Sequence, residues 1–381
     1  MFYKKTGRTT LSFVKSVVCT IFLFSIPHNI YAIEKNTNII ATVGPASEDV
    51  DTMKDLIKSG VNIFRLNFSH ANHEYHAKLI ANIRKASEKA GKKVEILADL
   101  QGPRFRIGKF KDKQVSIKTG DSFLFDLKDE LGDSKRVQFP HPEIIAVMPV
   151  GNAIFVDEGK LRFEVVKNNK TSLTLKIIKG GQIKNNKGVN IPGVLLPVEV
   201  ITTKDRKDVE FLLTQKPDYI ALSFVQSEKE LIELRGLFKG QKIKIVAKIE
   251  TTPSIEEAQL KKIAKEADLI MVARGDLSVE VSVENIATAQ NQIMKTLRSI
   301  EKPFIVATQM MESMTENIRP YNAEVIDVSY AVYNGAWSVM LSGETAMGKY
   351  PVETVSTMSA ILANAERDMK NKTAIQINCG N

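Results

Sequence analysis

Eight short runs of apolar, mostly β-branched residues recur along the chain, and each is followed by a segment with helix-like character. The runs cover 39–43, 62–67, 94–99, 218–223, 243–250, 268–274, 303–309 and 337–342. Strands that alternate with helices predict parallel β-α-β units. Eight such units predict an α/β fold of the TIM (β/α)8 barrel class. A doubly wound open sheet is the alternative, and it is less favoured because no G-x-G-x-x-G follows the first run.

The segment between the third and fourth runs, residues 105–195, has a different pattern. Glycine and asparagine turns separate strand-like pieces at Gln114–Ile117, Ser122–Leu127, Ala153–Val156, Leu161–Val166 and Ser172–Ile178. Short strands with frequent turns predict a small all-β domain, here a β-barrel inserted after the third strand. A domain over the mouth of a barrel can act as a lid that excludes water.

These patterns divide the chain into parts. We expect residues 33–104 and 196–368 to form the (β/α)8 barrel and residues 105–195 to form the inserted lid domain. The last helix is predicted over Val352–Arg367, which leaves residues 369–381 as a tail.

Polar side chains follow every predicted barrel strand. They are Thr42, Arg65, Asn67, Ser69, Asp99, Ser223, Lys248, Glu250, Arg274, Asp276, Thr308, Ser342 and Glu344. Lys248 and Glu250 are two residues apart and therefore face the same way in a strand. Desolvating such groups is costly unless they pair or bind something charged, and a structural ion pair is the simplest alternative. A ring of such residues at strand ends predicts an active site, because barrel chemistry lies at that face.

Composition narrows the classes of function. The 381 residues are 43% hydrophobic and 25% charged, which is ordinary for a globular protein with an ample core. The net charge is +9, but no basic run is long enough to predict a nucleic-acid face. Cys19 and Cys379 form neither a metal spacing nor a disulfide framework. His70, His73 and His76 have a spacing that leaves a metal site open as a less favoured alternative.

The N-terminus has the pattern of a secretory signal. Lys4, Lys5 and Arg8 precede the apolar run Val17–Ile26, and Ala32 supplies a small residue before a cleavage point. The run is too short to span a membrane. We expect residues 1–32 to be a signal-like segment and the mature chain to be exported, for example to the periplasm. The alternative is a cytoplasmic protein with an extended or misplaced start, and N-terminal sequencing of the protein from its own host distinguishes the two.

Several motifs together resemble pyruvate kinase, from about Thr37 to Ala365. The matching segments are Thr42–Ser47, Arg65–His70, Asp99–Pro103, Asn186–Asn190, Ala247–Glu250, Met271–Leu277, Ala307–Met310 and Leu341–Ala346. They occur in the family's order, at strand ends or at the edge of the insertion. The resemblance implies phosphoenolpyruvate and ADP as substrates, ATP and pyruvate as products, and Mg2+ or Mn2+ as a cofactor. Phosphoryl transfer needs the neutralised phosphate oxygens and fixed positions that such residues provide.

The resemblance also assigns roles to residues. The implied catalytic residues are Lys248, Arg65, Thr308, Ser342 and Glu344. The implied substrate-binding residues are Arg65, Lys248, Ala273, Arg274, Gly275, Asp276, Thr308 and Ser223. The implied nucleotide-binding residues are Pro45, Asn67, His70, Tyr75, Arg106 and Lys187. Glu250 and Asp276 are expected to hold the divalent metal, and Asn67, Ser69 and Asp99 match positions that hold a monovalent cation.

One departure from the family changes the cofactor prediction. Arg104 stands where the family often has an acidic residue next to the monovalent-cation position. A fixed guanidinium can replace a bound K+ in the charge balance. We therefore expect K+ to be dispensable.

A second departure concerns the C-terminus. The sequence lacks the C-terminal domain with which the family continues, so we expect no regulation through that domain, and a monomer or homodimer rather than a tetramer.

Two other functions stay open. The chain could be a carbon–carbon lyase on a related phosphoenolpyruvate/pyruvate barrel, or an inactive, repurposed exported binding protein.

Overall fold

The computed structural model describes residues 35–378, with side chains described through Asn371. The predicted signal-like segment, residues 1–32, therefore lies outside the described residues. The described residues belong to one compact unit. Eight parallel strands close into a barrel in the order β1-β17-β16-β15-β14-β13-β3-β2. Their bounds are β1 Asn38–Thr42, β2 Ile63–Asn67, β3 Glu95–Asp99, β13 Tyr219–Leu222, β14 Lys244–Ile249, β15 Leu269–Ala273, β16 Phe304–Ala307 and β17 Ser338–Leu341. The predicted (β/α)8 fold is confirmed.

The two-residue period of the strands decides which side chains enter the barrel. In β14, Ile245 and Ala247 belong to the core shared with the surrounding helices, whereas Val246 belongs to the core inside the barrel. Because successive side chains alternate, Lys248 and Glu250 continue the inward series of Val246. In β2, Ile63 is likewise an inward residue, which places Arg65 on the inner face two residues later.

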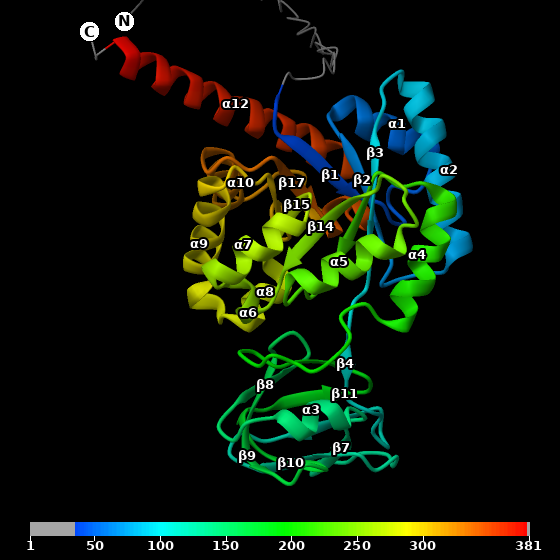
Figure 1. Cartoon of the computed structure of the whole chain (residues 1–381), viewed down its shortest axis with the longest axis vertical. Helices are drawn as coiled ribbons and strands as arrows, with labels where there is room; N and C mark the ends of the chain where they lie inside the picture. Colours follow the sequence, from blue (N-terminus) through cyan, green and yellow to red (C-terminus); the bar gives the residue numbers. More distant parts are fainter. Residues whose placement is uncertain (1–34, 379–381) are drawn as a thin grey trace, which may run out of the picture. The chain divides into compact units, whose positions relative to one another are not determined.

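Helices lie around the outside of the barrel strands (Figure 1). Their bounds are α1 Val50–Ser59, α2 His73–Ala90, α4 Thr203–Gln215, α5 Glu228–Leu237, α6 Thr252–Ile255, α7 Glu257–Glu266, α8 Arg274–Glu280, η1 Val283–Asn285, α9 Ile286–Ser299, η2 Glu312–Thr315, α10 Asn322–Tyr333, α11 Gly343–Ala346 and α12 Pro351–Asn378. Local signals set several ends: Asp49 caps α1, and Thr202 with Asp205 forms a capping box on α4. None of the described helices has the length and apolar character that crossing a membrane requires.

The insertion contains the elements between β3 and β13. They are β4 Phe105–Arg106, β5 Gln114–Ile117, β6 Ser122–Asp126, β7 Arg136–Gln138, α3 Pro142–Val147, β8 Ala153–Val156, β9 Leu161–Asn168, β10 Ser172–Lys179, β11 Gly181–Lys184 and β12 Gly188–Asn190. The strands form a seven-stranded sheet and a two-stranded ribbon rather than one closed barrel. The insertion also contains helix α3, so it is not purely β. The core of the insertion is a separate cluster of buried residues that includes Phe123, Phe125 and Phe163.

Helix α12 is longer than its sequence pattern predicted. It runs from Pro351 to Asn378, so the residues expected as a tail from 369 continue the helix through Asn378. Packing against α1, α10 and β1 supports its first part.

Candidate active site

Lys248 is the centre of a buried charged network at the carboxyl ends of the barrel strands. Its Nζ lies 2.9 Å from Glu250 Oε1 and 3.3 Å from Asp99 Oδ1, and it donates a hydrogen bond of 2.7 Å to Ser223 Oγ. The Lys248 side chain is 11% exposed and both carboxylate side chains are 1% exposed. A buried ammonium with several oxygen partners keeps its charge and is held in a fixed place.

Arg65 joins the same network from β2. Its Nε donates to Asp99 Oδ2 at 2.7 Å, and Nη1 donates to Thr42 Oγ1 at 3.0 Å. Asp99 therefore lies between two cations that come from different strands. Arg65 and Lys248 are separated by almost two hundred positions in the sequence. The structure brings their two positive charges next to one another.

Charge pairing and burial shift the ionisation of these groups. Burial works against ionisation of Asp99, but Lys248 and Arg65 outweigh it and hold the pKa of Asp99 below its usual range. Burial would likewise lower the pKa of Lys248, yet Asp99 and Glu250 raise it. For Glu250, burial is the larger effect and, with the negative charge of Asp276, raises the pKa to about 7 against the opposing influence of Lys248.

The residues predicted for a divalent metal fit that role. Glu250 also accepts a hydrogen bond of 2.7 Å from the backbone N–H of Phe224, which fixes its carboxylate. Asp276 is close enough to raise the pKa of Glu250 by repulsion. Two repelling carboxylates gain from a cation between them, and Mg2+ in proteins is usually bound by one or two carboxylates together with substrate oxygens and water. A site of this kind has only two protein ligands. In the described part of the chain, no group of three or more His, Cys, Asp or Glu residues is arranged to hold a metal ion.

A cavity of about 510 Å³ lies next to this network. Its lining includes Gly275 and Asp276 from α8 and a set of cationic residues that come mainly from the insertion. These cationic residues are Arg104, Arg106 and Lys187. A cavity whose lining combines acidic and basic side chains suits an anionic ligand that is accompanied by a metal.

The predicted nucleotide-binding residues fall into two groups. Arg106 donates to the backbone oxygen of Asn186 at 2.7 Å, and Lys187 forms an ion pair of 2.8 Å with Asp157, so both are held on the insertion. The other group lies on loops of the barrel. There Tyr75 OH donates to Glu48 Oε2 at 2.5 Å, and Pro45 and His70 are exposed. The barrel group does not line the cavity.

The oxygens predicted for a monovalent cation already have protein partners. Asn67 Oδ1 accepts from the backbone N–H of Ser69 at 3.1 Å, and Ser69 Oγ accepts from Arg104 Nη2 at 3.3 Å. Asp99 is paired with Arg65 and Lys248. These residues therefore fit a monovalent cation poorly. The guanidinium of Arg104 already binds Ser69 Oγ, one of the oxygens expected to bind the cation.

Three of the predicted catalytic residues follow the last two barrel strands: Thr308 comes directly after β16, Ser342 directly after β17, and Glu344 lies in α11. Glu344 is buried and accepts from the backbone N–H groups of Ser342 at 2.7 Å and Met311 at 3.2 Å. Burial raises the pKa of Glu344. Thr308 lies beside Gly275, and its φ of 70° is in the left-handed region. Non-glycine residues rarely adopt this conformation, and such strain is common at functional sites.

The side chain of Arg274 does not line the cavity. It is 8% exposed, forms an ion pair of 2.6 Å with Asp327, and donates to the backbone oxygen of Thr308. The donors of this side chain hold the loop after β16. The predicted role of Arg274 in substrate binding stays a prediction. The backbone of Ala273 and Gly275 lies at the start of α8, with Ala273 at its N-cap.

The histidine spacing has a structural explanation. His73 Nε2 lies 2.7 Å from Asp208 Oδ1, and His76 Nε2 lies 2.9 Å from the backbone oxygen of His70. His73 and His76 therefore have different partners, His70 is exposed, and among the described residues these histidines form no metal site.

Three acidic residues of the cavity, Asp157, Glu158 and Glu280, were missed by the sequence reasoning. Asp157 pairs with Lys187, and no signal within the insertion marks it. Glu280 also lines the cavity, and burial, with a contribution from Asp276, raises its pKa to about 7. The spacing of four residues from Asp276 on one helix could have indicated that both carboxylates share a face.

Comparison with known proteins places the barrel in a family. The model for the barrel domain of pyruvate kinase matches residues 34–355. The chain is 40% identical to a pyruvate kinase of Geobacillus stearothermophilus over 344 residues, which cover 89% of this chain and 58% of that protein. A pyruvate kinase of Methylorubrum extorquens is also 40% identical, over 334 residues that cover 88% of this chain and 69% of the relative.

A solved structure gives the same similarity in three dimensions. A crystal structure of a pyruvate kinase from Cryptosporidium parvum superposes with a TM-score of 0.85 at 35% sequence identity, covering 87% of this chain and 70% of that one. The chain therefore spans between about three fifths and seven tenths of the lengths of these relatives.

Proposed function

The chain belongs to the pyruvate kinase family, and from that premise we propose that it transfers the phosphoryl group of phosphoenolpyruvate to ADP, giving pyruvate and ATP. The observation that carries the proposal is the buried arrangement of Arg65, Lys248, Asp99 and Glu250 beside Asp276 at one end of the barrel. Phosphoryl transfer is catalysed mainly by positioning and by electrostatic stabilisation, and this network supplies fixed charges for both.

Each group has a role that follows from its place. Lys248 offers a fixed positive charge to the phosphoryl group in transit and to the enolate that forms as it leaves. Arg65 adds a guanidinium that can donate to phosphate oxygens. Glu250 and Asp276 would hold Mg2+ or Mn2+, which supplies charge neutralisation for phosphate and carboxylate oxygens when bound. Thr308, Ser342 and Glu344 are proposed to deliver the proton that converts the enolate to pyruvate.

Binding of ADP is proposed at the side of the cavity lined by Arg106 and Lys187. Both residues are cationic and are held by contacts within the insertion, so they can meet a nucleoside diphosphate without a large loss of conformational entropy. Pro45, Asn67, His70 and Tyr75 are proposed to contribute from the barrel.

A coupled assay for pyruvate tests the proposal. The purified chain is supplied with phosphoenolpyruvate, ADP and Mg2+, and Lys248→Met is the comparison variant. We expect turnover by the native chain and a loss of roughly 10²–10³ in kcat for the variant, because a preorganised charge is removed from the developing anion. Absence of turnover in the native chain would favour an exported binding protein, and pyruvate release from a carbon–carbon substrate without ADP would favour a lyase.

Activity without K+ is the second part of the proposal. Arg104 donates to Ser69 Oγ, which matches a ligand of the monovalent cation in the family. We expect the rate in buffer free of sodium and potassium to stay within about twofold of the rate with added K+, since the guanidinium already supplies the charge. Arg104→Glu should make the rate depend on K+. Strong activation of the native chain by K+ would contradict this part alone.

A further inference from the structure

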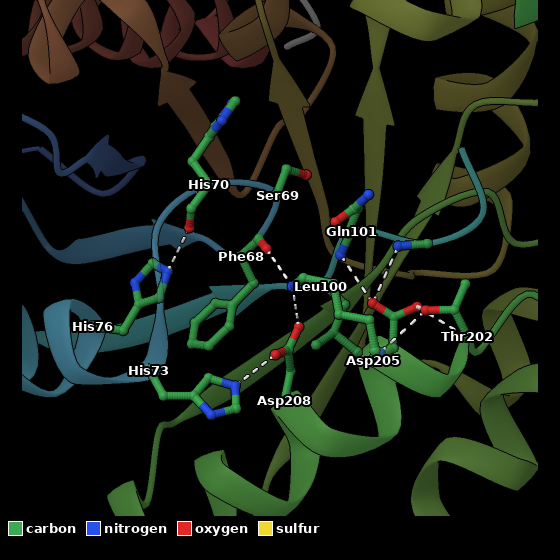
Figure 2. A network of polar contacts seen from close by, with 12 residues as sticks. Phe68, Ser69, His70, His73, His76, Leu100, Gln101, Thr202, Asp205 and Asp208 are labelled. Atoms are coloured by element: carbon green, nitrogen blue, oxygen red, sulfur yellow. Dashed lines mark hydrogen bonds and ion pairs between the residues drawn. The ribbon is translucent and has the colours of Figure 1, made fainter. Parts of the chain in front are cut away.

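Helix α4 carries three charged residues that the proposed phosphoryl transfer does not use. Figure 2 shows the polar network around its first two turns, with contacts to loops from other parts of the barrel. Asp205 and Asp208 have exposed fractions of 0% and 2%. Buried carboxylates are costly unless they are well paired, so their partners indicate what the helix holds in place.

Asp205 holds the loop that follows β3. Its Oδ1 accepts from the backbone N–H groups of Gln101 at 3.1 Å and Gly102 at 3.2 Å, while Oδ2 accepts from the Thr202 hydroxyl at 2.6 Å. One carboxylate therefore caps α4 and also binds a loop that lies about a hundred residues earlier in the sequence.

That loop makes a tight turn next to the catalytic network. Gly102 has a φ of 67°, and a Cβ added to it would lie 3.0 Å from the Cβ of Ser223. Ser223 is the residue whose hydroxyl accepts from Lys248. The position of the turn is therefore fixed on one side by α4 and on the other by the site itself.

Lys204 and Asp208 hold the loop that follows β2. Lys204 Nζ lies 2.6 Å from Asp208 Oδ2 and donates to the backbone oxygen of Phe68 at 2.7 Å. Asp208 Oδ1 lies 2.7 Å from His73 Nε2. The same carboxylate thus pairs with α2 and, through Lys204, with the loop.

The far end of this loop is held as well. His76 Nε2 donates to the backbone oxygen of His70 at 2.9 Å, and its ring stacks on Phe68 with centroids 4.0 Å apart. Burial lowers the pKa of His76, so the neutral ring keeps the donor on Nε2. Ser69 lies between the two anchored carbonyl groups.

The two anchored loops meet at one contact. Arg104, on the loop held by Asp205, donates to Ser69 Oγ at 3.3 Å, on the loop held by Lys204. We propose that Lys204, Asp205 and Asp208 are positioning residues that keep the two loops at the spacing at which Arg104 lines the cavity beside Arg106, where its guanidinium can meet the phosphates of the ADP proposed to bind there. This inference rests on the proposed phosphotransferase function and names the part of the chain that fixes its nucleotide side.

The physical reason is the cost of ordering Arg104. An arginine side chain loses much of its rotamer freedom when it is held, and the bond to Ser69 is long and exposed. Such a bond does not fix the side chain unless both loops are already in place. Displacement of a charged group by about 1 Å can cost on the order of a hundredfold in rate.

A double-mutant cycle tests the inference. Lys204→Met removes the donor to the Phe68 carbonyl while Asp208 keeps His73 as its partner, so the fold should survive. We expect kcat/KM for ADP to fall roughly tenfold to a hundredfold, mostly through KM, with little change in KM for phosphoenolpyruvate. In the Arg104→Met background the same substitution should change kcat/KM for ADP by less than about twofold, since the positioned group is already gone.

Controls separate positioning from general damage. Lys207→Met removes a lysine from the exposed face of the same helix and should leave both KM values within about twofold of native, and Lys204→Arg should recover most of the lost activity. Asp205→Asn keeps an acceptor oxygen and should show the same non-additivity with Arg104→Met, which covers the case in which Lys204→Met fails to fold. Additive losses in the double variants would overturn the positioning role while turnover by the native chain persists. A native chain without turnover would instead overturn the proposed function, and the positioning role with it.

Discussion

The balance of charge around Lys248 explains the ionisation of its neighbours. Arg65 and Lys248 face three carboxylates, Asp99, Glu250 and Asp276, which leaves an excess of negative charge if all are ionised. The chain relieves this excess at Glu250, whose pKa rises to about 7. A divalent cation would instead neutralise the excess negative charge, and the carboxylate of Glu250 would then be favoured in its ionised form. Metal binding and proton release are therefore linked at this residue.

Glu280 gives a pH dependence that can be measured without substrate. Burial is the main cause that raises its pKa from 4.5 to about 7, so the folded chain binds the proton more tightly than the unfolded chain. The free energy of unfolding should therefore decline as pH rises from about 4.5 to 7, by up to about 3 kcal/mol from this group. Glu280→Gln should remove that part of the decline and raise stability relative to native above pH 7.

Denaturant unfolding between pH 4.5 and 8, with a chelator present, checks the prediction. Glu250 contributes a decline of the same sign, so the difference between native and Glu280→Gln isolates Glu280. Glu284→Gln, at an exposed position in η1, is the matched control. Hydrogen bonds hold the pKa of Glu284 below its usual range, so this substitution should leave the shape of the curve near pH 7 unchanged. Parallel curves for native and Glu280→Gln would show that the Glu280 carboxyl titrates normally.

Residue types at strand ends could be predicted from the sequence, but their partners could not. The alternation in β14 places Lys248 and Glu250 on one face, and the structure has them as a pair. Nothing in the sequence shows that the Arg274 side chain leaves the cavity for Asp327, because that contact depends on where α10 packs. The pairing of Asp99 with Arg65 and Lys248 likewise depends on three strands meeting in one barrel.

Barrel strands were predictable to within about one or two residues because each is a buried apolar run that ends in polar residues. The missed elements are short ones in the insertion, β4, β7, β11, β12 and α3. The strands β4, β7 and β12 have only two or three residues, which is too few alternating positions to distinguish them from loops. The pairing of β11 with β5 is set by a contact distant in the sequence. The end of α12 was misjudged because no glycine or proline lies between Arg367 and Asn378 to end the helix earlier.

The loop after β1 depends on close contact with α11. A Cβ added to Gly44 would lie 2.5 Å from the backbone oxygen of Ala346, which has no room to move because it also accepts from the N–H of Ala46 at 3.0 Å. Gly44→Ala should therefore lower the free energy of unfolding by about 1–3 kcal/mol. Thermal and denaturant unfolding of the variant measure this cost.

Gly236 in α5 is the matched control for that substitution. No atom lies within 4 Å of a Cβ added there, and the residue is inside a helix. Gly236→Ala should raise stability by up to about 1 kcal/mol, because alanine loses less backbone entropy in a helix than glycine does. Equal effects of the two substitutions would mean that the Gly44 contact is not the constraint on this loop.

At the scale of the whole molecule, the buried residues form separate hydrophobic cores. One core lies between the barrel strands and the helices, a smaller one lies inside the barrel, and a third is confined to the insertion. Because the insertion has its own core, it can lose its packing without direct loss of barrel contacts. Trp337 is the single tryptophan of the sequence and packs against the core inside the barrel, so its fluorescence reports on the barrel alone.

Phe163→Ala should therefore separate two unfolding transitions. Phe163 is fully buried in the insertion, with ring centroids 5.8 Å from both Phe123 and Phe125, and its truncation should cost about 3–5 kcal/mol. We expect an earlier transition in the far-ultraviolet circular dichroism, which senses all strands, and a nearly unchanged midpoint in the fluorescence of Trp337. Phe64→Ala, a truncation of the same kind in the barrel, should shift the fluorescence midpoint instead. If Phe163→Ala moves both signals together by the same amount, the insertion and the barrel unfold as one cooperative unit, and the separate cores do not confer separate stabilities.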